Sequence, residues 1–326
     1  MNGLVSSSIT SGDGFDNAAS ISAFITAKAK SQILKPLTAK QKELAYRWLV
    51  HGPMRVVAQP LYMGLLNAEF IAHRAVDALR AVKPAADLRN VTAIIKTFER
   101  PRRLRSLVRS IRRFYPDLRI IVIDDSRDPV PLPGVTTHIM PYDSGLGAGR
   151  SKGLSLVETK YVLNLDDDFV FFNRTDLPRA LDLMERCSNI DIMGGMVIDL
   201  PLYITRDYRH PDLFESSVAS LVPAGQRIAG LEVYDKVADF FVARTDRIRL
   251  VDWDPALKRV VHADFFTRAK GNLVTVYNRD LRVLHVRNPY DTAYLNIRFN
   301  TGDDLAYLTQ KYAKPWGVSP DSGYRG

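Results

Sequence analysis

The chain has 326 residues, a formal net charge of +9, 46% hydrophobic residues and 25% charged residues, an ordinary composition for one large or two modest globular domains. Cys187 is the only cysteine, which excludes an internal disulfide or a cysteine-based zinc site and favours a reducing, cytoplasmic compartment. The sequence shows neither a secretory signal peptide nor 18 uninterrupted apolar residues, so we expect no membrane span. The positive charge fits either a solvated basic surface or an anionic partner. Nucleic acid is disfavoured, because zinc-finger spacings and RNP-type aromatic patterns are missing from the sequence.

The first part of the chain predicts a flexible start and then a helical extension. Residues 1–20 are rich in Ser, Gly and Asn, and we expect them to be flexible. Residues 21–89 form the predicted helical extension, which Pro53 and Pro60 should break into pieces. The stretch 59–76 has an apolar side, for which we favour packing on the main domain or on a second copy of the chain. A peripheral contact with a membrane interface is the alternative.

From residue 90 onward, short apolar runs alternate with helical patterns. The sequence predicts strands at 91–95, 119–126, 137–142 and 161–165, an arginine-rich helix at 101–115, and a glycine-rich turn at 145–153 that leads into a helix ending near 158. This alternation predicts a mixed, mainly parallel α/β sheet flanked by helices. We therefore expect a main domain over residues 90–290, followed by a C-terminal extension over 291–326.

Polar residues follow three of the predicted strands directly. They are Thr97–Arg100, Asp124–Asp125 and Asp166–Asp168. Ligands of parallel α/β sheets bind at the carboxyl ends of the strands. We therefore expect all three segments to face one crevice.

The three consecutive carboxylates of Asp166, Asp167 and Asp168 lie between two apolar runs, in the sequence YVLNLDDDFVFF. Such carboxylates repel one another and lose hydration unless a positive group lies among them. Mg²⁺ and Mn²⁺ typically bind one or two carboxylates together with substrate phosphates. The sequence therefore predicts an enzyme that uses a divalent metal and a nucleotide-activated substrate.

Three segments carry a resemblance to a known family. They are KTFERPRRLRSLVRSIRRFYPDLRIIVIDDS (96–126), MPYDSGLGAGRSKGLSLVETKYVLNLDDDFVF (140–171) and FFVARTDRIRLVDWDPALKRVVHADFF (240–266). They resemble the β-1,4-N-acetylgalactosaminyltransferase family that includes the ganglioside GM2/GD2 synthases, and more broadly the inverting glycosyltransferases with the GT-A fold. The animal members are Golgi proteins with a transmembrane anchor. Because this sequence shows no such anchor, we expect a cytoplasmic relative, either in solution or peripheral to a membrane.

The resemblance implies a UDP-sugar donor and assigns residues to its nucleotide. Residues at the end of the first strand would line the base and ribose pocket: Thr97, Phe98, Glu99 and Arg100. Asp124 and Asp125 would bind the uracil or ribose, since carboxylates accept from imide N–H groups and hydroxyls; a turn or helix cap is the alternative. Gly149 would allow the backbone to approach the ligand closely. Arg150 would reach the diphosphate or sugar unless it is a surface arginine.

The same resemblance assigns the metal and the catalytic base. Asp168 would bind Mn²⁺ or Mg²⁺ directly, Asp166 would touch the ribose or the metal through its outer shell, and Asp167 would meet the donor sugar. His285 would complete the metal shell, with His262 as the rival, and either is otherwise a core histidine. Asp264 would deprotonate the acceptor hydroxyl, where the relatives carry Glu; a helix N-cap is the alternative.

These expectations together predict an inverting, metal-dependent glycosyltransferase. The preferred donor is UDP-GalNAc, and the acceptor is a hydroxyl of a glycan or glycolipid. The alternatives are a catalytically silent scaffold protein with the same fold and a sugar-nucleotide nucleotidyltransferase. The second alternative is disfavoured because no N-terminal glycine-rich phosphate loop with a lysine is visible.

Overall fold

The computed structural model describes residues 44–45, 47–79, 87–209 and 211–312. The chain divides into two compact units, residues 1–58 and 59–326. In the first unit the structure describes a π-helical turn, η1 (Arg47–His51), and the start of helix α3 (Arg55–Leu79). The predicted flexible segment 1–20 lies outside the described residues, and the predicted domain limits at residues 20, 89 and 290 stay predictions.

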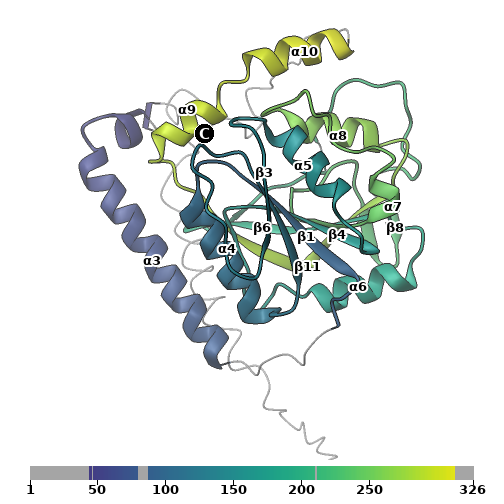
Figure 1. The fold of residues 1–326 in the computed structure, drawn as a ribbon, viewed down its shortest axis with the longest axis horizontal. Helices are drawn as coiled ribbons and strands as arrows, with labels where there is room; N and C mark the ends of the chain where they lie inside the picture. The colour runs from purple at the N-terminus through teal and green to yellow at the C-terminus, as the bar shows by residue number, and fades with distance from the viewer. Residues whose placement is uncertain (1–43, 46, 80–86, 210, 313–326) are drawn as a thin grey trace, which may run out of the picture. The chain divides into compact units, whose positions relative to one another are not determined.

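The second unit is built on one mixed sheet (Figure 1). Its strands are β1 (Val91–Thr97), β2 (Arg119–Asp124), β3 (Thr136–Ile139), β4 (Tyr161–Asp166), β5 (Phe169–Val170), β6 (Ile192–Leu200), β7 (Ile204–Thr205), β8 (Arg227–Ile228), β9 (Leu231–Val233), β10 (Phe241–Arg244) and β11 (Thr275–Val286). Their order is β3-β2-β1-β4-β10-β6-β11-β9-β8, with β5 paired to β11 and β7 to β6.

The sheet has a parallel core of strands β3, β2, β1 and β4, and a second parallel pair, β6 and β11. Strand β1 pairs in parallel with both β2 and β4, β2 pairs in parallel with β3, and β6 pairs in parallel with β11. Strand β10 is antiparallel to both of its neighbours, β4 and β6. The predicted α/β sheet with a parallel core is confirmed.

Helices cover both faces of the sheet. The helices that follow β1 in the chain are α4 (Pro101–Phe114), α5 (Leu146–Ser155), α6 (Leu177–Arg186), α7 (Thr245–Ile248), α8 (Val261–Ala269), α9 (Thr292–Arg298) and α10 (Gly302–Tyr312). Successive side chains of β1 point to opposite faces, as in any strand. Ala93 and Ile95 pack in a core with α4 and α6, and Ile94 packs in a second core with α5 and α8. The sheet is therefore buried on both sides.

Within the second unit, α3 packs on the sheet domain through one side. Leu66 is buried in a small core with Phe172 and Leu284, and Phe70 packs against that core. The favoured packing of stretch 59–76 on the main domain is thus confirmed. The predicted break at Pro60 is wrong. Proline inside a helix removes one i→i−4 hydrogen bond and crowds the preceding turn, but α3 continues past Pro60 to Leu79.

No helix among the described residues is both long enough and apolar enough to cross a membrane.

Candidate active site

The three polar segments predicted to converge lie at one edge of the sheet. In the parallel register Thr97 is opposite Asp124, and Lys96 is opposite Asp166. Because the carboxyl ends of parallel strands meet at one edge, the residues after β1, β2 and β4 share this edge. The expected convergence of the three segments is confirmed, and their role as a ligand site stays a prediction.

Two arginines and a threonine hold the three adjacent aspartates. Asp166 accepts a 2.6 Å hydrogen bond from Arg150 Nη2. Asp167 accepts from the Thr97 hydroxyl at 2.7 Å and forms an ion pair with Arg100. Asp168 accepts from Arg100 Nη1 at 2.8 Å. The structure therefore brings the predicted residues Thr97, Arg100 and Arg150 to the aspartates.

Arg150 is a buried residue of α5, not a surface arginine. Its guanidinium bridges Asp166 and Asp239, with Nη1 2.8 Å from Asp239 Oδ1. The sequence reading missed Asp239, because an aspartate before a short apolar strand carries no local signal of its role. Breaking a buried ion pair leaves uncompensated charge and typically costs about 3–5 kcal/mol.

We predict that Arg150→Met lowers the free energy of unfolding by about 3–5 kcal/mol, because Asp166 and Asp239 both lose their cation. Urea denaturation measures this. Lys160→Met is the matched control, since the Lys160–Glu185 pair is about half exposed and such pairs contribute about 1 kcal/mol or less. Equal losses in the two variants would show that Arg150 does not hold the cluster together.

Asp168 and His285 form a pair suited to a divalent cation. His285 Nε2 lies 3.3 Å from Asp168 Oδ2, while its Nδ1 lies 2.6 Å from Asp199. A carboxylate on the second ring nitrogen is the usual way to orient a metal-binding histidine. Asp168 Oδ1 is buried and has no hydrogen-bond partner. These donors fit a metal that takes its remaining ligands from substrate phosphates.

The described residues contain no ready-made cage for a metal. Among them, no group of three or more His, Cys, Asp and Glu side chains is arranged to hold one. Asp166 faces Arg150, so its carboxylate is engaged elsewhere.

The pKa values of this cluster follow from burial and from the surrounding cations. Burial raises the pKa of Asp166 to about 6, against the opposing effect of Arg150. Burial also acts to raise the pKa of Asp168, but His285 and Arg100 hold that pKa well below its ordinary value. For His285, burial acts to lower the pKa, and Asp168 and Asp199 outweigh it and raise the pKa to about 9. The cluster therefore keeps a carboxylate ionised at Asp168.

The residues predicted to bind the nucleotide lie at the same edge and are engaged with one another. Asp124 accepts from the N–H of Ser126 at 2.9 Å, and Asp125 accepts from Gly145 N–H at 2.9 Å and pairs with Lys96. Both aspartates are buried. These contacts with turn residues match the alternative role as turn caps. A role of the two aspartates in binding a nucleotide stays a prediction.

Three further predicted residues have local roles at this edge. Glu99 has a positive φ of 56° and accepts from the N–H of Arg127 at 2.8 Å. Phe98 is buried, with its ring centroid 5.5 Å from that of Tyr142. At Gly149 an added Cβ would lie 2.5 Å from Lys96 Cγ. Glycine at this position therefore allows α5 to pack closely on β1.

Asp264 lies in a separate buried network. It is fully buried in the first turn of α8, whose N-cap is Val260, so the alternative role as an N-cap is wrong. It accepts from Arg268 Nε at 2.9 Å, from the Tyr312 hydroxyl at 2.8 Å and pairs with Lys311 Nζ at 2.7 Å. The end of α10 therefore covers this carboxylate.

His262 contacts Asp239 and not Asp168. Its Nε2 is 2.6 Å from the Val237 carbonyl oxygen and 3.7 Å from Asp239. Burial lowers its pKa from 6.5 to about 4, so the ring is neutral at neutral pH. Of the two histidines, His285 is the one in contact with Asp168.

We predict that His262 makes the protein labile to acid. The unfolded chain binds a proton on this histidine near its ordinary pKa, whereas the folded chain does so only near pH 4, so stability is present above pH 6.5 and is lost as pH falls towards 4. Between about pH 7 and 4 the free energy of unfolding should fall by about 3 kcal/mol more than that of His262→Gln. Parallel pH profiles in the two proteins would contradict this.

Helix α9, beyond the segments that carry the resemblance, contributes two residues that the sequence reading missed. The guanidinium carbon of Arg100 lies 4.0 Å from the Tyr294 ring centroid. Arg298 interacts electrostatically with Asp166 and Asp168 and donates a long 3.5 Å hydrogen bond to the Tyr294 hydroxyl. In the sequence, the spacing of four residues between Tyr294 and Arg298 could have indicated that the two side chains share one face of a helix.

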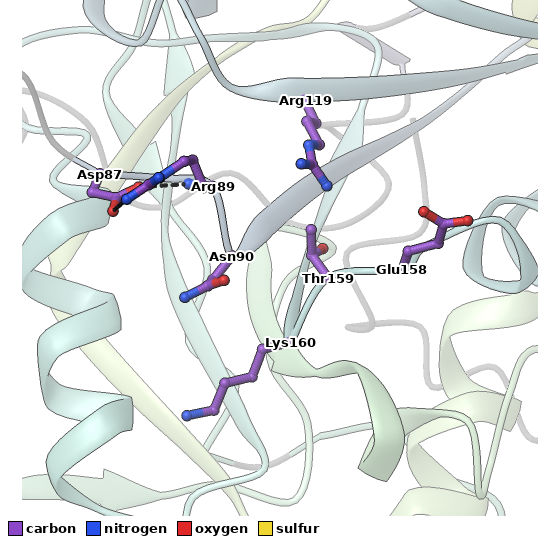
Figure 2. Close-up of a pocket in the computed structure, with 7 residues that line it drawn as sticks. All are labelled: Asp87, Arg89, Asn90, Arg119, Glu158, Thr159 and Lys160. Atoms are coloured by element: carbon purple, nitrogen blue, oxygen red, sulfur yellow. Dashed lines mark hydrogen bonds and ion pairs between the residues drawn. The ribbon is translucent and has the colours of Figure 1, made fainter.

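An open polar hollow of about 330 Å³ lies at the opposite edge of the sheet (Figure 2). It is lined by Asp87, Arg89, Asn90, Arg119, Glu158, Thr159 and Lys160. Arg119 begins β2, and Asn90 and Lys160 directly precede β1 and β4. Because ligands of parallel sheets bind at the carboxyl ends, we do not assign the active site to this hollow.

Comparisons with known proteins show what the chain is similar to. Residues 92–246 match the model of Glycosyl transferase family 2. Human Beta-1,4 N-acetylgalactosaminyltransferase 1 is 42% identical over 195 residues, which cover 56% of this chain and 36% of the relative. The rat protein of the same name is 42% identical over 237 residues, which cover 69% of this chain and 43% of the relative. Mouse Beta-1,4 N-acetylgalactosaminyltransferase 2 is 35% identical over 215 residues, which cover 63% of this chain and 41% of the relative.

The chain spans less than half the length of these curated relatives. Among solved structures, residues 1–349 of TarS from S. aureus in complex with UDP-GlcNAc align with a TM-score of 0.48 at 15% identity, covering 61% of this chain and 59% of that one.

Proposed function

We propose that the chain is an inverting, metal-dependent glycosyltransferase, because it is 42% identical to human and rat Beta-1,4 N-acetylgalactosaminyltransferase 1 over the matched residues, and residues 92–246 match the model of Glycosyl transferase family 2. It takes a UDP-sugar, with UDP-GalNAc preferred, and transfers the sugar to a hydroxyl of a glycan or glycolipid with β-linkage. The observation that carries the proposal is the meeting of Asp168, with its unpartnered buried oxygen, and His285 at the carboxyl edge of the sheet.

The donor would lie along this edge. Asp168 and His285 would hold Mn²⁺ or Mg²⁺, which neutralises charge on the leaving diphosphate when bound. Arg100 and Arg150 fix the three aspartates in place, and the ends of β1 and β2 would take the uracil and ribose. Arg298, which is exposed and interacts electrostatically with Asp166 and Asp168, would meet phosphate oxygens.

The acceptor hydroxyl needs a base on the side of the sugar opposite the nucleotide. We propose Asp264 for this role. Its present partners Lys311 and Tyr312 are both on α10, so the acceptor would have to replace them. The cytoplasmic location and the identity of the acceptor stay predictions.

Release of UDP from UDP-GalNAc, UDP-Gal, UDP-GlcNAc and UDP-Glc tests the proposal directly, with Mn²⁺, Mg²⁺ or EDTA present. We expect release that requires metal and is fastest with one donor. Binding of UDP-sugars without any release would favour the silent scaffold. Formation of pyrophosphate from UTP and a sugar phosphate would favour the nucleotidyltransferase.

A further inference from the structure

The side of α3 that points away from the sheet domain is apolar and uncovered within the described residues. Leu61, Leu65 and Ile71 are 63%, 50% and 68% exposed. Ala68 and Ala72 continue the same face, because residues spaced by three and four share one side of a helix. The opposite face of α3 is the one packed on the sheet domain.

Leu202, in the loop before β7, and Ile204, the first residue of β7, extend this apolar face. Leu202 and Ile204 are 55% and 46% exposed. Tyr203 between them donates its hydroxyl to Glu69 of α3 and lies 3.0 Å from His73 Nε2. We call the set Leu61, Leu65, Ile71, Val76, Leu202 and Ile204 the α3 surface. Contiguous exposed apolar patches on soluble domains usually mark an interaction site.

The neighbouring helix α4 is strongly cationic. It carries six arginines and no acidic residue, and Arg102, Arg109 and Arg113 are exposed. Arg103 acts electrostatically on Tyr62 of α3, which places the two helices side by side, as Figure 1 also shows. In the sequence, residues 17–42 before this region add five lysines and no acidic residue.

We propose that the α3 surface docks on an anionic phospholipid membrane, with the α4 arginines meeting the lipid headgroups. An apolar helix face flanked by cations is the pattern that binds such interfaces, and each basic residue near the surface contributes about 1 kcal/mol. A second copy of the chain is the less favourable occupant, because it would bring another net charge of +9 to a surface flanked by arginines.

The docking also places the membrane close to the catalytic edge. Tyr62, on the inner side of α3, donates its hydroxyl to the Arg287 carbonyl at 2.9 Å. Arg287 follows the strand that carries His285. One helix diameter, about 10 Å, therefore separates the α3 surface from the strands of the site.

Co-sedimentation of the full chain with vesicles tests the proposal. We expect binding to phosphatidylglycerol-containing vesicles, weaker binding to pure phosphatidylcholine, and loss of binding at high salt. The double variant Leu61→Glu/Ile71→Glu should reduce binding by more than about tenfold, since it buries two charges in the interface. Leu250→Glu is the matched control, because Leu250 is 67% exposed, lies after α7 and outside the α3 surface, and its substitution should leave binding unchanged.

A second variant pair tests the charge contribution. Arg102→Gln/Arg109→Gln should weaken binding to anionic vesicles and leave binding to neutral ones unchanged. Equal vesicle binding by Leu61→Glu/Ile71→Glu and wild type would overturn the proposal. So would a lipid-free dimer, detected by light scattering, that the same variant dissociates. Unaltered UDP-induced thermal shifts in the variants would show that the donor site is intact, so the two proposals can fail separately.

Discussion

Asp168→Ala is expected to abolish the metal-dependent part of UDP binding. The substitution removes the only carboxylate that contacts both His285 and Arg100 among the described residues, and with it the unpartnered oxygen that fits a cation. Changes outside the direct ligands of a metal already cost about 10–100-fold in affinity, so we expect a loss of more than about 100-fold here. Titration calorimetry with UDP, with and without Mn²⁺, measures it.

Asp280→Ala is the control for this variant, because Asp280 is a surface residue whose side chain is 60% exposed. It should bind UDP and Mn²⁺ as the wild type does. If Asp168→Ala melts at the wild-type temperature and still shows the full effect of Mn²⁺ on UDP affinity, Asp168 is not a metal ligand.

Asp264→Asn is expected to remove sugar transfer and to leave donor binding intact. The amide keeps the size of the carboxylate but cannot take a proton, and loss of a general base typically costs about 10²–10⁴-fold in rate. The affinity for UDP should stay within about twofold, since the contacts of Asp264 are to Arg268, Lys311 and Tyr312 and not to the aspartate cluster. Initial rates at saturating donor and acceptor test this.

Normal turnover by Asp264→Asn would show that another group is the base. Asp239 is then the next residue to substitute, because it lies beside Arg150 with its side chain 17% exposed. A rate collapse in Asp239→Asn, with Asp264→Asn active, would transfer the role to Asp239.

The parallel core of the sheet and the edge with the candidate site could both be predicted from the sequence. Apolar runs of strand length alternated with helical spacing, and the structure has β1, β2 and β4 at the predicted positions. The contacts of Thr97 and Arg100 with Asp167 follow from this topology, because both neighbouring strands end at the same edge.

What the sequence could not predict are contacts between segments far apart in the chain. Asp239 reaches Arg150 across 89 residues, and Asp199 reaches His285 across 86. Tyr312 reaches Asp264 across 48. Such pairings depend on how loops return to the sheet, and an isolated aspartate or tyrosine carries no period or turn signal that would indicate its partner.

The thermal stability of the protein in the presence of nucleotides tests the central claim most directly. A ligand that binds only the folded state raises the melting temperature by mass action. The account predicts that UDP and UDP-sugars raise it, that Mn²⁺ increases the shift, and that UDP-GalNAc gives the largest effect. No shift with any nucleotide at saturating metal would contradict the proposal that this site binds a UDP-sugar.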